Sequence, residues 1–194
     1  MLLGIIAHQR PAAGSAVSPW LPLAVSLVAL AFTILTFWWT NLRKGKLQVG
    51  YPRTFAATTQ RSRVMVLLPL SLRNTGPISI GVRALRLQLS QDSHHCTLHH
   101  VRTRTAMRLE ESSVDFATNF VVDGRQTLLR LAEFEAADAF TFSAGRVEAS
   151  LEVLLEDSKR WRGLRTFALF VTSEAESTIP KAFITYDNAP LLPH

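Results

Sequence analysis

This 194-residue chain has few cysteines and glycines, and its charged residues are unevenly distributed along the sequence. These features exclude several classes of protein. The first 40 residues contain one charged side chain, Arg10, and residues 41–91 contain nine basic residues but no acid. A single cysteine, Cys96, excludes a scaffold held by internal disulfides. Only nine glycines and nine prolines exclude collagen and simple repeats. A composition of 47% hydrophobic and 19% charged residues excludes a disordered chain.

The longest uncharged run, residues 20–40, is the strongest signal in the chain. It reads WLPLAVSLVALAFTILTFWWT. At 1.5 Å per residue, about 20 residues of helix cross the roughly 30 Å hydrocarbon core of a bilayer. Tryptophan prefers the level of the lipid headgroups, and Trp20 stands at one end of the run with Trp38 and Trp39 at the other. The run therefore predicts a transmembrane helix over residues 20–40, after a short tail of residues 1–19.

Two alternatives to a transmembrane helix remain open at this point. A cleaved signal peptide has a basic start, a shorter apolar core and a cleavage site between small residues. Here the start is almost uncharged and the run ends in aromatic and basic residues. A buried core helix would be shorter and striped with polar positions. Both alternatives fit the residues less well than a membrane span does.

The segment that follows the run, residues 41–46, predicts which side of the membrane the rest of the chain occupies. It carries Arg43, Lys44 and Lys46, whereas the N-terminal flank carries only Arg10 and the amino terminus. By the positive-inside rule, residues 41–194 lie in the cytoplasm of a single-pass plasma-membrane protein. Juxtamembrane cations are also attracted to anionic lipid headgroups. The unpaired Cys96 and the lack of an Asn-x-Ser/Thr site fit a reducing compartment.

From residue 47 onward, apolar residues recur with the period of two that is typical of β-strands. The clearest strand is 147–155, and 64–72, 78–82, 85–89 and 165–172 alternate in the same way. Between them we expect a turn at Asn74–Pro77, a bulge near Arg83–Ala84 and a hairpin at Asp123–Gly124. Pro69 should face a sheet edge or a bulge. Residues 128–139 are the one segment that could form a turn or two of helix.

About seven to nine short strands with one apolar face need a second layer to cover that face. We therefore predict that residues 46–190 form one immunoglobulin-like antiparallel β-sandwich, long enough to have its own core.

The order of these features resembles that of uncharacterised bacterial single-pass membrane-anchored β-sandwich proteins. The resemblance is carried by an aromatic-ended helix, then Asn41-Leu42-Arg43-Lys44-Gly45-Lys46, then a strand leading to Leu72-Arg73-Asn74-Thr75-Gly76, then Leu85-Arg86-Leu87. It implies a membrane anchor and an immunoglobulin-like fold, and it implies no activity, substrate or cofactor.

A cluster of histidines and one cysteine, His94-His95-Cys96-x-x-His99-His100, is the densest set of metal-ligating residue types. On an extended strand His94 and Cys96 face the same way, about 6–7 Å apart, whereas His95 and His99 are about 13 Å apart. The spacing matches no standard zinc module. We therefore assign no metal ligand, and keep His94, Cys96 and His100 as the candidates for an alternative function as a zinc or copper sensor or enzyme.

Signals for catalysis are weak. No Gly-x-Ser-x-Gly nucleophile elbow or phosphate-binding glycine loop occurs. The acid pairs Glu110/Glu111, Glu133/Glu135 and Glu156/Asp157 are read as solvent-facing. The sequence predicts a non-enzymatic interaction or structural module at the membrane surface, without a cofactor. Its expected partners are the bilayer, anionic headgroups and an unidentified protein. Nucleic acid binding by a membrane-anchored regulator is the less favoured reading, because the basic residues do not cluster with stacking aromatics.

Overall fold

The structure, a computed structural model, describes residues 20–60, 63–104, 114–137 and 140–188. The chain divides into two compact units, residues 1–40 and residues 41–194. The second unit holds all the described strands and is called the β-domain below.

The apolar run forms a helix, as predicted. α1 spans Trp20–Phe37 and continues as a π-helical turn over Trp38–Leu42. Together they make 23 residues with a mean hydropathy of 2.1 in an 18-residue window, long and apolar enough to cross a membrane. No residue of α1 is buried. The Ser26 and Thr33 hydroxyls donate to the Pro22 and Ala29 carbonyls, each at 2.8 Å. These hydroxyls are thereby satisfied within the helix, as a segment surrounded by lipid requires.

The β-domain is built on one antiparallel sheet. Its main path runs through β10 (Arg162–Val171), β9 (Gly145–Leu155), β4 (Ile80–Gln91), β5 (His94–Arg104), β8 (Thr127–Ala136), β3 (Arg63–Asn74), β2 (Thr54–Gln60) and β11 (Ile184–Asp187). Three short strands join its sides: β1 (Leu47–Val49) on β3, β6 (Val114–Phe116) on β5 and β7 (Phe120–Val122) on β4.

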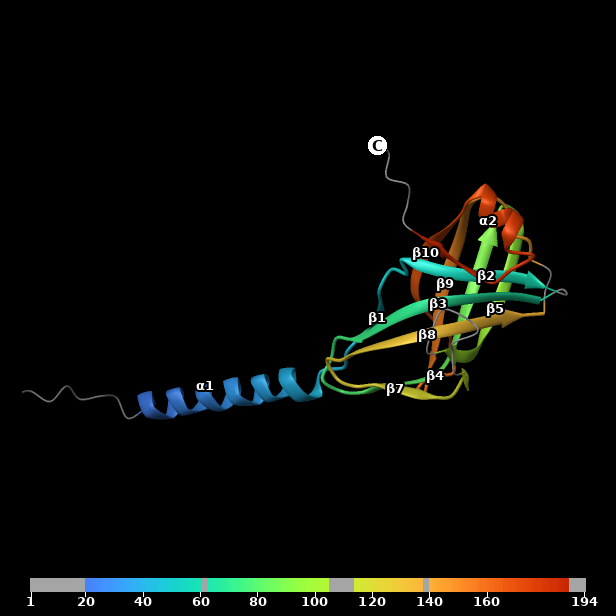
Figure 1. Cartoon of the computed structure of the whole chain (residues 1–194). Coiled ribbons are helices and arrows are strands. Elements are labelled where there is room, and N and C mark those ends of the chain that lie inside the picture. The colour runs from blue at the N-terminus through green and yellow to red at the C-terminus, as the bar shows by residue number, and fades with distance from the viewer. Residues whose placement is uncertain (1–19, 61–62, 105–113, 138–139, 189–194) are drawn as a thin grey trace, which may run out of the picture. The chain divides into compact units, whose positions relative to one another are not determined.

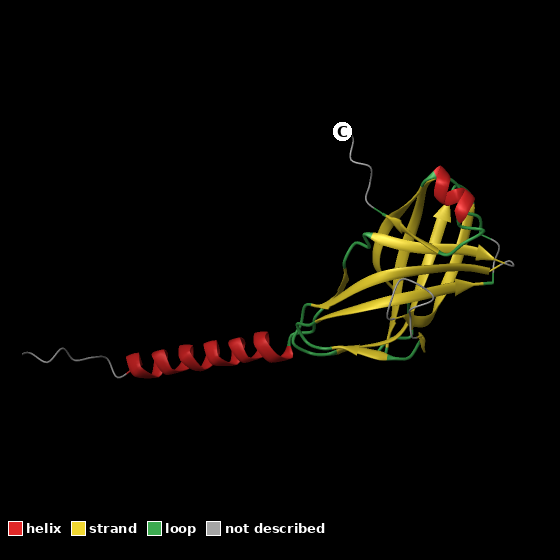
Figure 2. Ribbon diagram, viewed as in Figure 1, coloured by secondary structure: helices red, strands yellow, loops and turns green. Residues whose placement is uncertain are grey.

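The sheet is curled into a half-barrel, so that one face encloses the core. Strands β2, β3 and β8 cross in front of β9 and β4 (Figure 1), and strands make up most of the described part of the domain (Figure 2). Alternate residues of β3 face inward, among them Val66, Leu68 and Leu70, and all three are buried. The main-β prediction is confirmed. The immunoglobulin-like sandwich is not confirmed, because all eleven described strands belong to one hydrogen-bonded sheet rather than two.

The two edges of the curled sheet are joined by side chains instead of a strand ladder. Asn188 follows β11 and is fully buried. Its Nδ2 donates to the Ala168 carbonyl of β10 at 2.9 Å, and its Oδ1 accepts the Phe170 N–H at 3.0 Å. Tyr51 Oη also donates to the Ala168 carbonyl, and Arg165 donates to the Val49 carbonyl. We call this line of contacts the seam. It satisfies backbone groups that an open edge would leave unpaired.

The two ends of the half-barrel differ. At one end a short helix, α2 (Ser173–Thr178), covers the core with Ala175 and the following Ile179, each 1% exposed. The Ile179 carbonyl accepts hydrogen bonds from the Thr58 hydroxyl and the Thr59 N–H of β2, which hold α2 in place. At the other end, the residues that approach the core come from the segment that follows α1.

Several local predictions can be compared with the structure. The register of β4 on β9 shifts between Val82 and Ala84, which confirms the expected bulge. Pro69 lies where β3 passes from its pairing with β2 to its pairing with β1, in the interval that neither ladder covers.

Two other local predictions are wrong. A turn does form at Asp123–Gly124, but β7 then pairs with β4 and β8 with β3, so no hairpin results. Residues 127–136 are strand throughout, because β8 is paired on both sides and its inward residues complete the core.

The seam predicts that Asn188 stabilises the whole domain. In Asn188→Ala the buried Phe170 N–H and Ala168 carbonyl lose a partner, which should lower the free energy of unfolding by about 2–4 kcal/mol. We expect faster hydrogen exchange at the Phe170 amide, measured on the full chain in detergent. Thr185→Ala, at an exposed position of the same edge strand, is the control and should cost less than about 1 kcal/mol. Equal losses in the two variants would show that the seam contributes nothing particular.

Candidate functional site

A cavity with a mainly apolar lining lies at the end of the half-barrel that α2 does not cover. It has a volume of about 580 Å³. Four segments line it: residues 44–47 after the span, residues 78–81 at the start of β4, residues 153–157 at the end of β9, and residues 162–164 at the start of β10. We call it the end pocket.

The segment that follows the span is fastened to the β3–β4 turn, and this fixes one wall of the pocket. The Lys46 N–H donates to Thr75 Oγ1 at 2.9 Å, and the Thr75 N–H donates to the Lys46 carbonyl at 3.1 Å. β1 then begins at Leu47 and pairs with the end of β3, with Leu47 opposite Asn74. Lys44 and Lys46 are therefore part of the folded domain, not of a free linker.

The turn itself is organised by Asn74, which is fully buried. Its Nδ2 donates to the Ile78 and Val122 carbonyls at 2.7 and 3.1 Å, and its Oδ1 accepts the Gly76 N–H at 3.0 Å. Asparagine commonly forms such bonds to backbone two residues on. Gly76 packs against Gly45 so closely that a Cβ on either residue would collide with the backbone of the other. The sequence Asn74-Thr75-Gly76 thus holds the 43–46 segment in place, and the predicted turn is confirmed.

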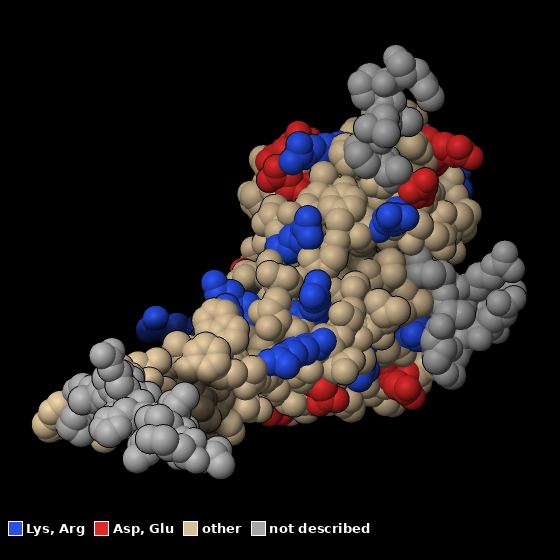
Figure 3. All heavy atoms as spheres, turned by 90° about the vertical axis from the view of Figure 1, so that its left-hand side faces the viewer, with Lys and Arg blue, Asp and Glu red and all other residues tan. Residues whose placement is uncertain are grey.

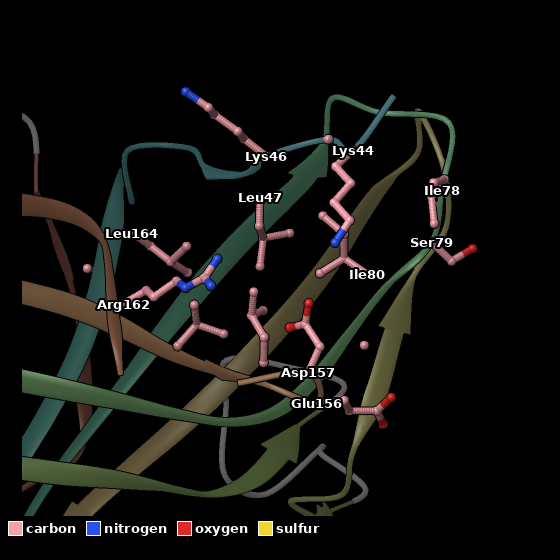
Figure 4. A pocket seen from close by; sticks show the side chains of 15 residues that line it. Lys44, Lys46, Leu47, Ile78, Ser79, Ile80, Glu156, Asp157, Arg162 and Leu164 are labelled. Carbon is pink, nitrogen blue, oxygen red and sulfur yellow. The ribbon is translucent and has the colours of Figure 1, made fainter. Parts of the chain in front are cut away.

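Charged side chains gather at the pocket from two separate parts of the chain. Figure 4 shows Lys44, Asp157 and Arg162 directed into the cavity, while Lys46 and Glu156 point away from its middle. Glu156 packs over Gly81, which leaves no room for a Cβ there. In the described part of the chain no ion pair joins Lys44 or Arg162 to an acid. Two cations and one carboxylate therefore face the same space.

Beneath these charges the walls are apolar. Leu47, Leu155 and Leu164 are partly buried and pack against the main core. Val153 is 1% exposed and forms part of that core, and Ile80 is half-buried. The end pocket is therefore the place where the core of the half-barrel comes to the surface. Apolar walls with a few converging polar groups are the usual make-up of small-molecule sites.

The predicted membrane-anchoring residues lie on both sides of the unit boundary. Trp20 begins α1, and Trp38 and Trp39 lie in its π-helical turn with their ring centroids 6.4 Å apart. All three indoles are exposed. Arg43, Lys44 and Lys46 follow directly and are exposed as well. Of the six, only the two lysines also line the end pocket, a position that could not be predicted from the local sequence.

The histidine and cysteine cluster lies on β5. It is therefore extended, which is the geometry used above to derive the distances between its members. Cys96 is buried, His94 is exposed at the start of the strand, and His100 is partly buried beside Phe134, with its Nε2 3.3 Å from Thr103 Oγ1. Among the residues that the structure describes, no group of three or more His, Cys, Asp or Glu side chains could hold a metal ion.

One acid pair was misread from the sequence. Glu133 is fully buried rather than solvent-facing, and its carboxylate pairs with Arg102 at 3.3 Å and with Arg104. Glu135 pairs with Arg63 at 3.1 Å. The ion pairs form because β5 and β3 flank β8 in the sheet, which the sequence alone does not reveal. Glu110 and Glu111 lie outside the described residues.

The lysines and arginines of the β-domain do not form one continuous basic patch on the face shown in Figure 3. They stand singly, with neutral residues between them, and acids lie toward the margins of that face.

The Gly45–Gly76 contact predicts a difference between two glycines that line the same pocket. In Gly45→Ala the new methyl group collides with the Gly76 backbone and with Asn74 Oδ1. We expect a loss of about 2 kcal/mol or more in the free energy of unfolding. Gly163→Ala is the matched control, because no atom lies within 4 Å of its Cβ, and it should change stability by less than about 1 kcal/mol. Similar values for the two variants, measured by urea unfolding, would contradict the fastening of residues 43–46.

His100 predicts a loss of stability in mild acid. Burial, with a smaller contribution from the nearby Arg130 charge, lowers the pKa of His100 from 6.5 to about 4. Between those values the unfolded chain binds a proton that the folded chain does not, so stability falls as pH drops from about 6.5 to 4, by at most about 3 kcal/mol. His100→Gln should flatten this dependence, measured by urea unfolding across that range. His99→Gln, at an exposed position on the same strand, should leave it intact.

Comparison with known proteins leaves the chain without a family assignment. No family model matches it, and no curated protein matches it. A protein from Archaeoglobus fulgidus, known from a crystal structure, is similar at 8% sequence identity over 77% of this chain and 98% of that chain. The TM-score of 0.30 is too low for this likeness to bear on fold or function.

Proposed function

We propose that this chain is a single-pass plasma-membrane protein whose β-domain is a non-catalytic binding module, held at the cytoplasmic surface of the bilayer. The observation that carries the proposal is the uncharged helical stretch Trp20–Leu42, 23 residues with a mean hydropathy of 2.1 in its 18-residue window and no buried side chain in α1. A helix of this kind is stable in lipid, because its backbone is satisfied internally and its apolar surface faces hydrocarbon.

The short connection between the span and the β-domain supports the same proposal. Only Arg43, Lys44 and Gly45 separate Leu42 from Lys46, which is hydrogen-bonded to the β3–β4 turn. The four residue steps from Leu42 to Lys46 reach about 14 Å at most in extended chain. A span inserted in a bilayer therefore keeps the end-pocket side of residue 46 near the headgroups. The positive charges at 43, 44 and 46 favour the cytoplasmic side.

The form of the β-domain supports a binding role. Its seam and its α2 cap complete the half-barrel except at the end pocket, which combines apolar walls with converging charges. A site that binds without catalysis needs no more than this. A partner protein would find further contact area on the exposed strand faces of such a domain.

The proposal predicts that the full chain behaves as an integral membrane protein. Expressed without tags at its N-terminus, it should sediment with membranes and resist extraction by alkaline carbonate, because burial of the span is worth far more than any surface attraction. A reporter enzyme that works only in the cytoplasm should be active when fused after His194, and one that works only outside the cytoplasm should be inactive. The mass of the membrane-bound chain should include residues 20–42, which distinguishes an anchor from a removed signal sequence.

Deletion of residues 20–42 is the control and should release the β-domain into the soluble fraction. Charge reversal at Arg43, Lys44 and Lys46 should reduce the cytoplasmic signal. Release of the intact chain by carbonate would contradict the anchor, and a C-terminal reporter active only outside the cytoplasm would contradict the orientation.

A further inference from the structure

The end pocket has an upper, charged part and a lower, apolar part, and a ligand must suit both. The lower part is made by Leu47, Leu155 and Leu164, which are partly buried on the core. Replacing the water on this surface by hydrocarbon is favourable, with a free energy of about 0.8 kcal/mol for each buried CH₂ group. The ligand therefore has an alkyl portion.

The upper part of the pocket favours a phosphodiester over other polar groups. Lys44 and Arg162 reach into the cavity from opposite segments, and neither is held by an ion pair within the described residues. Guanidinium and ammonium groups bind phosphate oxygens strongly, the guanidinium through two parallel hydrogen bonds. With Asp157 facing the same space, the net charge of the three groups is one positive charge, which matches the single negative charge of a phosphodiester.

The place of the pocket in the chain indicates where such a ligand comes from. Lys44 follows Leu42, the last residue of the apolar span, by two residues, a reach of about 7 Å. With the span in a bilayer, as the proposed function requires, Lys44 lies at the level of the headgroups. The nearest molecules that combine an alkyl chain with a phosphodiester are then the phospholipids of that same leaflet.

We propose that the end pocket binds one anionic phospholipid of the host membrane, of the phosphatidylglycerol class. The phosphodiester lies between Lys44 and Arg162, and part of one acyl chain lies on the leucine wall. Asp157 accepts hydrogen bonds from the headgroup hydroxyls. The volume of about 580 Å³ falls within the range of about 300–1,000 Å³ usual for small-molecule sites, so it holds a headgroup and part of one chain while the remainder stays in the bilayer.

The test uses the full chain, purified in detergent and titrated with short-chain phosphatidylglycerol while bound lipid is counted by native mass spectrometry. The wild type should bind one molecule. Lys44→Ser combined with Arg162→Ser should weaken this binding about tenfold or more, because both charged contacts to the phosphate are lost.

The matched control removes two cations that lie next to the pocket in the chain but do not line it. Lys159 and Arg160 are exposed in the β9–β10 turn, so Lys159→Ser combined with Arg160→Ser should change affinity less than about threefold. All four positions are exposed, so the folds of both double variants should match the wild type by circular dichroism. Equal weakening by the two pairs would show general electrostatic attraction and overturn the site.

Two further ligands separate the sources of the phosphate. Glycerol phosphate, which lacks the acyl chain, should compete poorly, and short-chain phosphatidylcholine, which has no net charge, should bind at least about tenfold more weakly. Effective competition by glycerol phosphate would show that the ligand is a soluble phosphate compound and not a lipid. Because this titration is done in detergent, it can fail while the carbonate test succeeds, or succeed while that test fails, so the two proposals are tested separately.

Discussion

A curled sheet has two edges and two ends, and the fold of this β-domain follows from how each is covered. Curling brings the apolar face of eleven strands inward, but it leaves β10 facing β1 and β11 without a continuous ladder between them. Asn188 and Tyr51 satisfy the β10 backbone in place of a strand. α2 covers one end of the core. Within the described residues no helix covers the other end, and the proposed ligand site rests on that asymmetry, because an apolar ligand is bound most favourably where apolar core is exposed.

The segment after the helix belongs to the β-domain as much as to the anchor. Lys46 is hydrogen-bonded to Thr75, and Gly45 is packed on Gly76, so one wall of the end pocket is formed by residues that directly follow the apolar helix. This arrangement couples the two properties of the chain. A change that loosens the β3–β4 turn would disturb the pocket in two ways, because the turn holds the segment that carries Lys44 and also contributes Ile78 and Ser79 to the lining.

Features set by local sequence were predictable, and features set by long-range pairing were not. Alternation identified β3 and β9, uncharged length identified α1, and Asn74-Thr75-Gly76 identified a turn. The single sheet was missed because alternation shows which residues face the core but not which strands lie side by side. The same limit explains Glu133, whose partners Arg102 and Arg104 come from a neighbouring strand, and residues 127–136, where pairing on both sides overrides a weak helical pattern. Asp157 was noted only as a member of an acid pair, and nothing in the sequence indicated that the fold brings it and Arg162 to the same cavity as Lys44.

The three cations after the span are therefore not equivalent, although a count of charges treats them so. For the proposed cytoplasmic orientation all three count equally, because the positive-inside rule depends on the number of cations and their position in the sequence. Lys46 points outward, whereas Lys44 points into a cavity with apolar lower walls. In the proposed arrangement the total charge sets the topology and a single residue contacts the lipid phosphate, and the geometry of one turn decides which residue that is.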